Sequence, residues 1–136
     1  MDRKDLQALS KIRAKEAKAL LDAGLHDGAF YLAGYAVECA LKACIAKKTS
    51  RHEFPDKDRV NKSYTHKLDE LIKLAELEES HKAEMKSASF RTDWGFVKLW
   101  SEESRYRRPD PKNAEGLVAA IMKRRGGIFS WLKKYW

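Results

Sequence analysis

The chain has 136 residues, of which 43% are apolar and 35% are charged, and its formal net charge is +8. This length favours one domain over residues 1–136 and allows roughly two-thirds of the unfolded surface to be buried, while the composition excludes a disordered chain. Residues 98–136 carry ten Lys or Arg against four Asp or Glu. Such a surface attracts phosphate polyanions or an acidic partner, or else serves solubility alone.

Residues 5–22 are predicted to form an amphipathic helix that ends at Gly24, with Asp27 as the cap of a second helix over residues 28–47. Apolar side chains cover almost every side of the second helix. Because so small a chain can hardly cover such a helix, we expect part of its surface to face a second copy or another protein.

The second helix carries a narrow polar strip of Tyr31, Glu38 and Lys42. A membrane span of residues 29–46 is rejected because Glu38 and Lys42 would each cost about 3 kcal/mol at the bilayer centre. Cys39 and Cys44 are five residues apart, so they cannot pair with each other and are expected to pack in the core. Two unpaired thiols and an N-terminus without an apolar signal region indicate a cytoplasmic protein.

Residues 48–64 are predicted to be a long charged connection, either mobile or functional. Thr65 is predicted to cap a third helix. Its expected buried stripe consists of Leu68, Leu71, Ile72 and Ala75. Residues 80–104 are predicted to be helical, with one helical pattern that begins at Ser80 and another that begins at or before Thr92. The two patterns form either one bent helix or two helices.

Asp110 followed by Pro111 predicts the start of the last helix. The apolar pattern of this helix continues across Gly126 and Gly127, which predicts a kink and not two separate helices. No strand pattern or repeat is present. The predicted class is all-α, an antiparallel bundle of about five helices around a four-helix core.

Several segments of the chain resemble the HEPN domain family over about residues 3–132. They are AFYLAGYAVECALKACI, THKLDEL, a Trp shortly before ESRYR, and a terminal helix. The resemblance implies a helical bundle that forms homodimers and associates with RNA or nucleotides. It also implies a minimal nucleotidyltransferase as partner, often in a toxin–antitoxin pair. Some members of the family are metal-independent ribonucleases marked by an Arg and a His with four to six residues between them.

The ribonuclease signature fits this chain only in part. Arg105 lies late in the chain, as in the family, but no His follows it, because the last His is His81. Arg59 and His66 have six residues between them, although they fall in the long connection and at the start of the third helix. His66 is suited to act as a general base near neutral pH, or it is an ordinary packed histidine.

The predicted anion-binding patch consists of Arg105, Tyr106, Arg107 and Arg108, ahead of a helix N-terminus that also favours anions. Trp94 and Trp100 precede the patch and are either stacking platforms for bases or core residues. Glu38 and Lys42, flanked by Tyr31 and Tyr35, are either polar contacts of the same groove, a solvated strip or a pair at a dimer seam.

The sequence therefore predicts a HEPN-like helical dimer that binds nucleotide or RNA, or a nucleotidyltransferase partner. Two alternatives stay open: a metal-independent ribonuclease that uses Arg59 and His66, or Arg105, and a purely structural adaptor protein. No cofactor is expected because phosphate-loop and dinucleotide motifs are absent from the sequence. No metal is expected because the four His show no ligand spacing.

Overall fold

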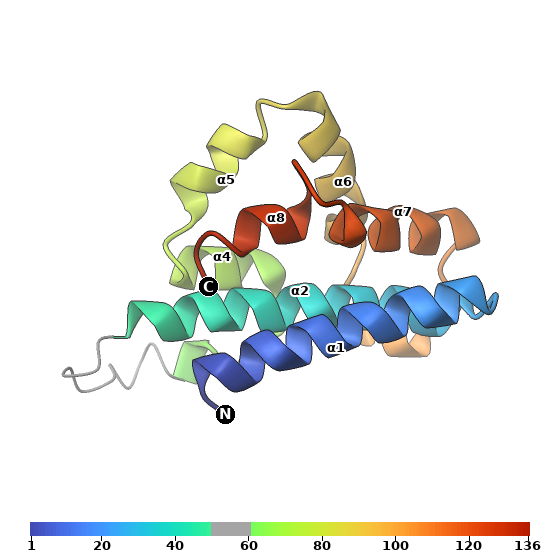
Figure 1. Ribbon diagram of the computed structural model, residues 1–136, viewed down its shortest axis with the longest axis horizontal. Helices are drawn as coiled ribbons and strands as arrows, with labels where there is room; N and C mark the ends of the chain where they lie inside the picture. The colour runs from blue at the N-terminus through green and yellow to red at the C-terminus, as the bar shows by residue number, and fades with distance from the viewer. Residues whose placement is uncertain (50–60) are drawn as a thin grey trace.

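A computed structural model describes residues 1–49 and 61–136, and every regular element in these residues is helical (Figure 1). The α-helices are α1 (Arg3–Asp22), α2 (His26–Lys48), α4 (Leu68–Leu74), α5 (Glu78–Glu84), α6 (Ala88–Lys98), α7 (Pro111–Met122) and α8 (Ile128–Leu132), with a 3-10 turn η1 (Glu102–Tyr106). The all-α class is confirmed for this part of the chain. Most of the predicted connection, residues 50–60 with Arg59, lies outside the described residues.

The ends of α1 follow local rules that the sequence displays. The Asp2 carboxylate accepts a hydrogen bond of 2.8 Å from the Asp5 backbone N–H, and the Asp5 carboxylate accepts one of 3.0 Å from Asp2. Gly24 ends the helix in a left-handed conformation, φ +79°, which glycine adopts without strain. The expected cap of α2 is wrong, because α2 starts at His26 and Asp27 lies inside its first turn.

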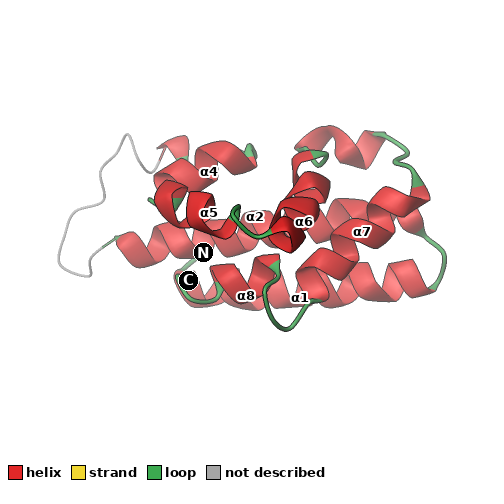
Figure 2. Cartoon of the chain, turned by 90° about the horizontal axis from the view of Figure 1, so that it is seen from above, coloured by secondary structure: helices red, strands yellow, loops and turns green. Residues whose placement is uncertain are grey.

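Helix α2 is the centre of the molecule. It packs along α1 and also contacts α4, α7, α8 and η1. Small residues allow a close approach to α1, and Ser10 Oγ donates a hydrogen bond of 2.8 Å to the Ala36 carbonyl across this contact. Seen from above in Figure 2, α1 and α4 lie on opposite sides of α2.

The rest of the chain covers α2 far better than expected. The helix is long and apolar enough to cross a membrane, yet 72% of its most apolar window is buried inside the protein. It is therefore a core helix. The expectation that the chain cannot cover α2 is wrong, because α1, α4, α7 and α8 pack around it. The composition of α2 consequently gives no argument for a homodimer.

The third helix of the prediction begins two residues later than expected. Thr65 Oγ1 accepts a hydrogen bond from the Lys67 backbone N–H, and α4 itself starts at Leu68 with Lys67 at the capping position. The predicted buried stripe is confirmed, because all of its members are at most 7% exposed: Leu68, Leu71, Ile72 and Ala75.

Residues 80–104 form separate elements and not one bent helix. Helix α5 starts at Glu78, so Ser80 does not begin it, and Thr92 lies inside α6. Helix α6 begins after Ser87, whose hydroxyl accepts a hydrogen bond from the Phe90 backbone N–H. The turn η1 follows α6 and places the segment ESRYR beside α2.

The C-terminal region starts at the predicted residue but forms two helices in place of one kinked helix. The Asp110 carboxylate caps α7 by accepting a hydrogen bond of 2.9 Å from the Lys112 backbone N–H, with Pro111 in the first turn. The expected kink is wrong, because the helical conformation stops at Met122 and α8 is a separate helix. Gly126 adopts φ +67° in the connection, a left-handed conformation that interrupts the helix before α8 packs on α2.

Candidate functional site

A buried carboxylate on α2 lies at the centre of the candidate site. Glu38 is 2% exposed, although it stands in a helix made mostly of alanine and other apolar residues. Its Oε1 lies 2.9 Å from His66 Nδ1, and its Oε2 lies 3.5 Å from Lys42 Nζ. The solvated-strip interpretation of Glu38 is wrong, since the chain itself covers the carboxylate. A buried carboxylate needs such partners to offset its lost hydration.

His66 joins this carboxylate to the surface turn η1. Its Nε2 lies 3.4 Å from Glu102 Oε1, and the same oxygen lies 4.0 Å from Arg105 Nη2. The His66 side chain is 41% exposed, whereas that of Glu38 is 3% exposed. We call Lys42, Glu38, His66, Glu102 and Arg105 the His66 cluster. It runs from the core to solvent across three elements distant in sequence.

The cluster defines what the imidazole can do. A neutral ring that donates Nδ1–H to Glu38 turns the lone pair of Nε2 toward Glu102 and the outside, while an imidazolium donates to both carboxylates. The first form is suited to take a proton, and the second is suited to contact an anion. Glu38 fixes the ring orientation in both forms.

The His66 ring borders a cavity of about 750 Å³. Residues 65–69 form one wall, and the end of α6 and the residues up to Glu103 form the other. Trp94 and Trp100 line the cavity, yet they are only 6% and 5% exposed, so the core interpretation of both indoles is confirmed. Their edges give the cavity an apolar floor, and Lys67 and Lys98 lie on its lining.

Tyr31 and Tyr35 extend the aromatic packing around Trp100. The Tyr31 ring stacks on Tyr35 and on Trp100, with centroid distances of 6.2 Å in each pair. Trp100 Nε1 donates a hydrogen bond of 3.0 Å to the Tyr31 carbonyl. The Trp100 indole lies directly over Gly34, where an added Cβ would stand 2.2 Å from the ring. Burial, followed by the nearby Cys39 and Glu38, raises the pKa of Tyr35.

The predicted anion-binding patch is divided, and only Arg105 belongs to the His66 cluster. Its guanidinium lies 4.8 Å from the centroid of the Tyr106 ring, and Tyr106 itself is 78% exposed. Arg105 and Tyr106 therefore form a flat cationic and aromatic surface beside Glu102. Such a surface is suited to stack on a planar ring.

Arg107 and Arg108 are held by carboxylates away from the His66 cluster. Arg107 Nη2 lies 2.9 Å from Glu103 Oε2, and Arg108 Nε lies 3.0 Å from Asp27 Oδ2 at the start of α2. Both pairs are exposed, so each contributes little to stability. The two carboxylates nevertheless offset the positive charge of the predicted patch. The sequence pattern alone therefore overstated the net charge of this patch.

The sequence analysis missed two residues. Glu102 bridges His66 and Arg105, and only its position next to ESRYR pointed to it. His81 is half-buried, with its ring centroid 4.4 Å from that of Trp94, and burial followed by the charge of Lys98 lowers its pKa. Within the described residues, no group of three or more His, Cys, Asp or Glu is arranged to hold a metal ion.

Both cysteines are buried, as predicted. Burial raises the pKa of Cys39 to about 11 and that of Cys44 to about 12. Neither thiol is therefore activated as a nucleophile, since the thiolate is the reactive form.

Comparison of the chain with protein-family models, with curated proteins and with solved structures finds no match.

Proposed function

We propose that the chain is a HEPN-like helical module that binds nucleotide or RNA in the cavity beside His66. One observation carries the proposal. Three of the segments that carry the family resemblance each contribute a residue to the His66 cluster. Glu38 lies in AFYLAGYAVECALKACI, His66 lies in THKLDEL, and Arg105 lies in ESRYR. Packing alone gives no reason for the segments to contribute a carboxylate, an imidazole and a guanidinium to the same place.

The cavity lining carries Asp69, Glu102 and Glu103 as well as two lysines, so support for a nucleotide comes from particular groups and not from net charge. His66 and Lys67 offer cationic or hydrogen-bonding groups for phosphate on one wall, and Lys98 stands on the other. Arg105 and Tyr106 offer a stacking surface beside Glu102, which lines the cavity. A phosphate bound here displaces Glu102 from His66 and Arg105, because both groups then donate to the ligand.

An NMR titration with AMP, UMP and a short oligouridylate tests this proposal. Backbone amide signals of residues 65–69 and 97–103 should shift, and His66→Ala should weaken the binding at least about tenfold, the loss expected for a charge-assisted contact. His26→Ala is the matched control, because His26 lies at the opposite end of α2 from Lys42 and should leave binding unchanged. Saturating ligand that shifts none of these signals contradicts the proposal.

A second candidate function is metal-independent RNA cleavage, which the Glu38–His66 contact favours. His66 Nε2 would take the proton of a ribose 2′-hydroxyl, whose oxygen attacks the adjacent phosphorus. The bond from phosphorus to the 5′-oxygen breaks, that oxygen gains a proton, and a 2′,3′-cyclic phosphate forms. Arg105 is placed to offset the charge on the phosphate oxygens. Arg59, the other arginine of the sequence prediction, lies outside the described residues.

Labelled RNA incubated with the purified protein and a chelator tests for cleavage. Activity should end in cyclic phosphate products and should fall at least about a hundredfold in His66→Ala, the loss of a general base. An inactive wild-type protein, or an equal loss in His26→Ala, would remove this candidate and leave the binding function.

The assembly is also a proposal. The resemblance supports a cytoplasmic homodimer that partners a minimal nucleotidyltransferase, in a toxin–antitoxin pair, with α1, α2, α6 and α7 as the four-helix core. The contacts of α1 with α2, of both with α7, and of α7 with α6 support this core. A structural adaptor is the alternative. Light scattering tests the dimer, and affinity purification that recovers one protein and no nucleic acid would favour the adaptor.

A further inference from the structure

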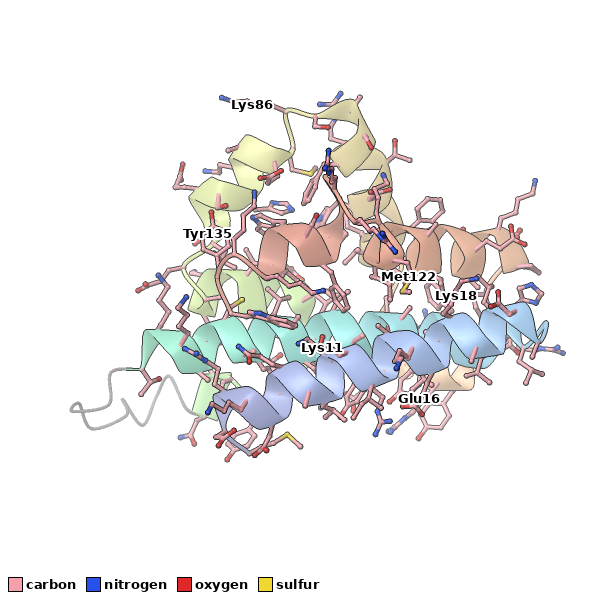
Figure 3. The ribbon with its side chains drawn as sticks, in the orientation of Figure 1. Lys11, Glu16, Lys18, Lys86, Met122 and Tyr135 are labelled. Atoms are coloured by element: carbon pink, nitrogen blue, oxygen red, sulfur yellow. The ribbon has the colours of Figure 1, made fainter. Side chains whose placement is uncertain are left out.

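A second groove, on the other side of α2 from the His66 cluster, is lined by positive charge. It lies between α1 and the α7–α8 connection, and its volume is about 420 Å³. Its ten lining residues include five cations and no carboxylate. The cations are Lys11 and Lys15 of α1, Lys123 and Arg124 after α7, and Lys133 after α8. Figure 3 shows Lys11 on α1 and Met122, another lining residue, at the end of α7 on the same face.

Most of these charges are unpaired. Lys123 Nζ lies 2.7 Å from Asp93 Oδ2, but no carboxylate of the described residues forms an ion pair with Lys11, Lys15, Arg124 or Lys133. This contrasts with Arg107 and Arg108, which both have acidic partners. Unpaired, exposed cations gathered around one concavity repel each other and are available to an external anion.

A neighbouring hollow extends the positive surface. Arg124 and Ser130 line both cavities, and the second one, about 300 Å³ in volume, adds Arg125 and Lys134 with a single acid, Glu84. The cationic surface thus runs along α8 and past the end of α7. Its extended form fits an anion with repeated charges better than it fits a single phosphate group.

An aromatic residue helps to hold the lysines in place. Lys11 Nζ lies 5.5 Å and Lys133 Nζ 5.9 Å from the centroid of the Trp136 ring, so cation–π contacts draw the two side chains together from α1 and from the residues after α8. Unlike ion pairs, these contacts leave the net charge unchanged. The ammonium groups are therefore partly ordered before any ligand arrives, which lowers the entropy lost on binding.

We propose that this groove, which we call the α1–α8 groove, binds the sugar–phosphate backbone of single-stranded nucleic acid without base specificity. Lys11 and Lys15 are one helical turn apart, about 6 Å along α1, so they can contact successive phosphates of an extended strand. The groove has a volume of about 420 Å³, which can receive part of one extended strand but is small for a duplex. Because the cations surround a concavity, a flat membrane surface reaches them less well.

Fluorescence anisotropy with a labelled oligouridylate at a series of KCl concentrations tests the proposal. Each phosphate neutralised on a single strand contributes about −0.7 to the slope of log K against log salt, so contacts from the four cations without an ion pair give a slope of about −2.8. Lys11→Gln/Lys15→Gln should make the slope less steep by about 1.4 and weaken binding at least about tenfold at low salt. A labelled duplex of the same length should bind more weakly than the single strand.

The matched control is Lys4→Gln/Lys18→Gln, which removes the same charge from the same helix outside the groove lining. It should retain the wild-type slope and bind within about twofold of the wild type. All four positions are exposed, so circular dichroism should show unchanged folding in both variants.

Equal losses in the two double variants would overturn the proposal, since only net charge would then matter. Binding of polyglutamate or anionic vesicles to the groove, without binding of the oligonucleotide, would also overturn it. So would a loss of oligonucleotide binding in Arg107→Gln/Arg108→Gln that Lys11→Gln/Lys15→Gln does not show. His66→Ala should leave the salt slope unchanged. The α1–α8 groove and the His66 site can therefore fail independently.

Discussion

Replacing His66 with Ala should destabilise the folded protein, and most of this loss should disappear when Glu38 is replaced with Gln as well. Glu38 is almost fully buried, and His66 supplies the shorter of its two side-chain contacts, 2.9 Å against 3.5 Å for Lys42. Without the imidazole, the carboxylate keeps its desolvation cost but loses its better partner. In Glu38→Gln the charge is absent, so the partner matters much less.

The expected magnitude follows from the exposure of the two groups. A hydrogen bond to a charged group contributes about 1.5–3 kcal/mol, and the 41% exposure of the His66 side chain reduces this to about 1–2 kcal/mol. In the Glu38→Gln background the same replacement should cost about 0.5 kcal/mol or less. For a chain of 136 residues, 1 kcal/mol corresponds to roughly 3–4 °C in Tm, so His66→Ala should melt about 4–7 °C lower.

Urea denaturation of the wild type, both single variants and the double variant measures the coupling as a double-mutant cycle. The coupling free energy should be about 1 kcal/mol, with unchanged m values. If the two replacements add within about 0.3 kcal/mol, Glu38 and His66 act independently. The orientation of His66 by a buried carboxylate, on which the proposed site depends, would then be refuted.

Other predictions concern the core. Gly34→Ala should lower the free energy of unfolding in urea by about 1–3 kcal/mol because the new Cβ meets Trp100. Gly95→Ala has open space around its Cβ and should raise the free energy of unfolding by up to about 1 kcal/mol. Equal effects of the two replacements would contradict the packing of Trp100 on Gly34. Burial lowers the pKa of His81 below its ordinary 6.5, so the unfolded chain binds the proton first. The stability from neutral His81 is therefore complete above pH 6.5 and lost as the pH falls through the lowered value. Melting curves between pH 7.5 and 5 should show this decline, and His81→Gln should reduce it; an unchanged decline would place its cause elsewhere. Cys44, whose pKa is raised to about 12, should react with Ellman's reagent only as fast as the chain unfolds, and rapid reaction without denaturant would contradict its burial.

The sequence by itself determined the helical class and much of the local structure. Helical spacing located α1, α2 and the buried stripe of α4, because a period of 3.6 residues is written in the order of apolar side chains. Gly24 and Asp110 marked helix ends because capping depends on neighbouring residues alone. The separation of α8 from α7 was missed, since a continuing apolar phase does not reveal that Gly126 takes a left-handed conformation.

Only the tertiary structure decided how these elements serve a site. The residues around Glu38 in the sequence fit a buried carboxylate bound to His66 as well as they fit an exposed polar strip. Which of the two forms depends on where residues 65–67 and η1 pack on α2. For the same reason the sequence could count cations but could not tell that Arg108 meets Asp27 while Lys11 and Lys133 form no ion pair with the residues that the structure describes. Periodicity assigns side chains to faces of a helix, whereas long-range packing determines which faces meet and which charges reach solvent.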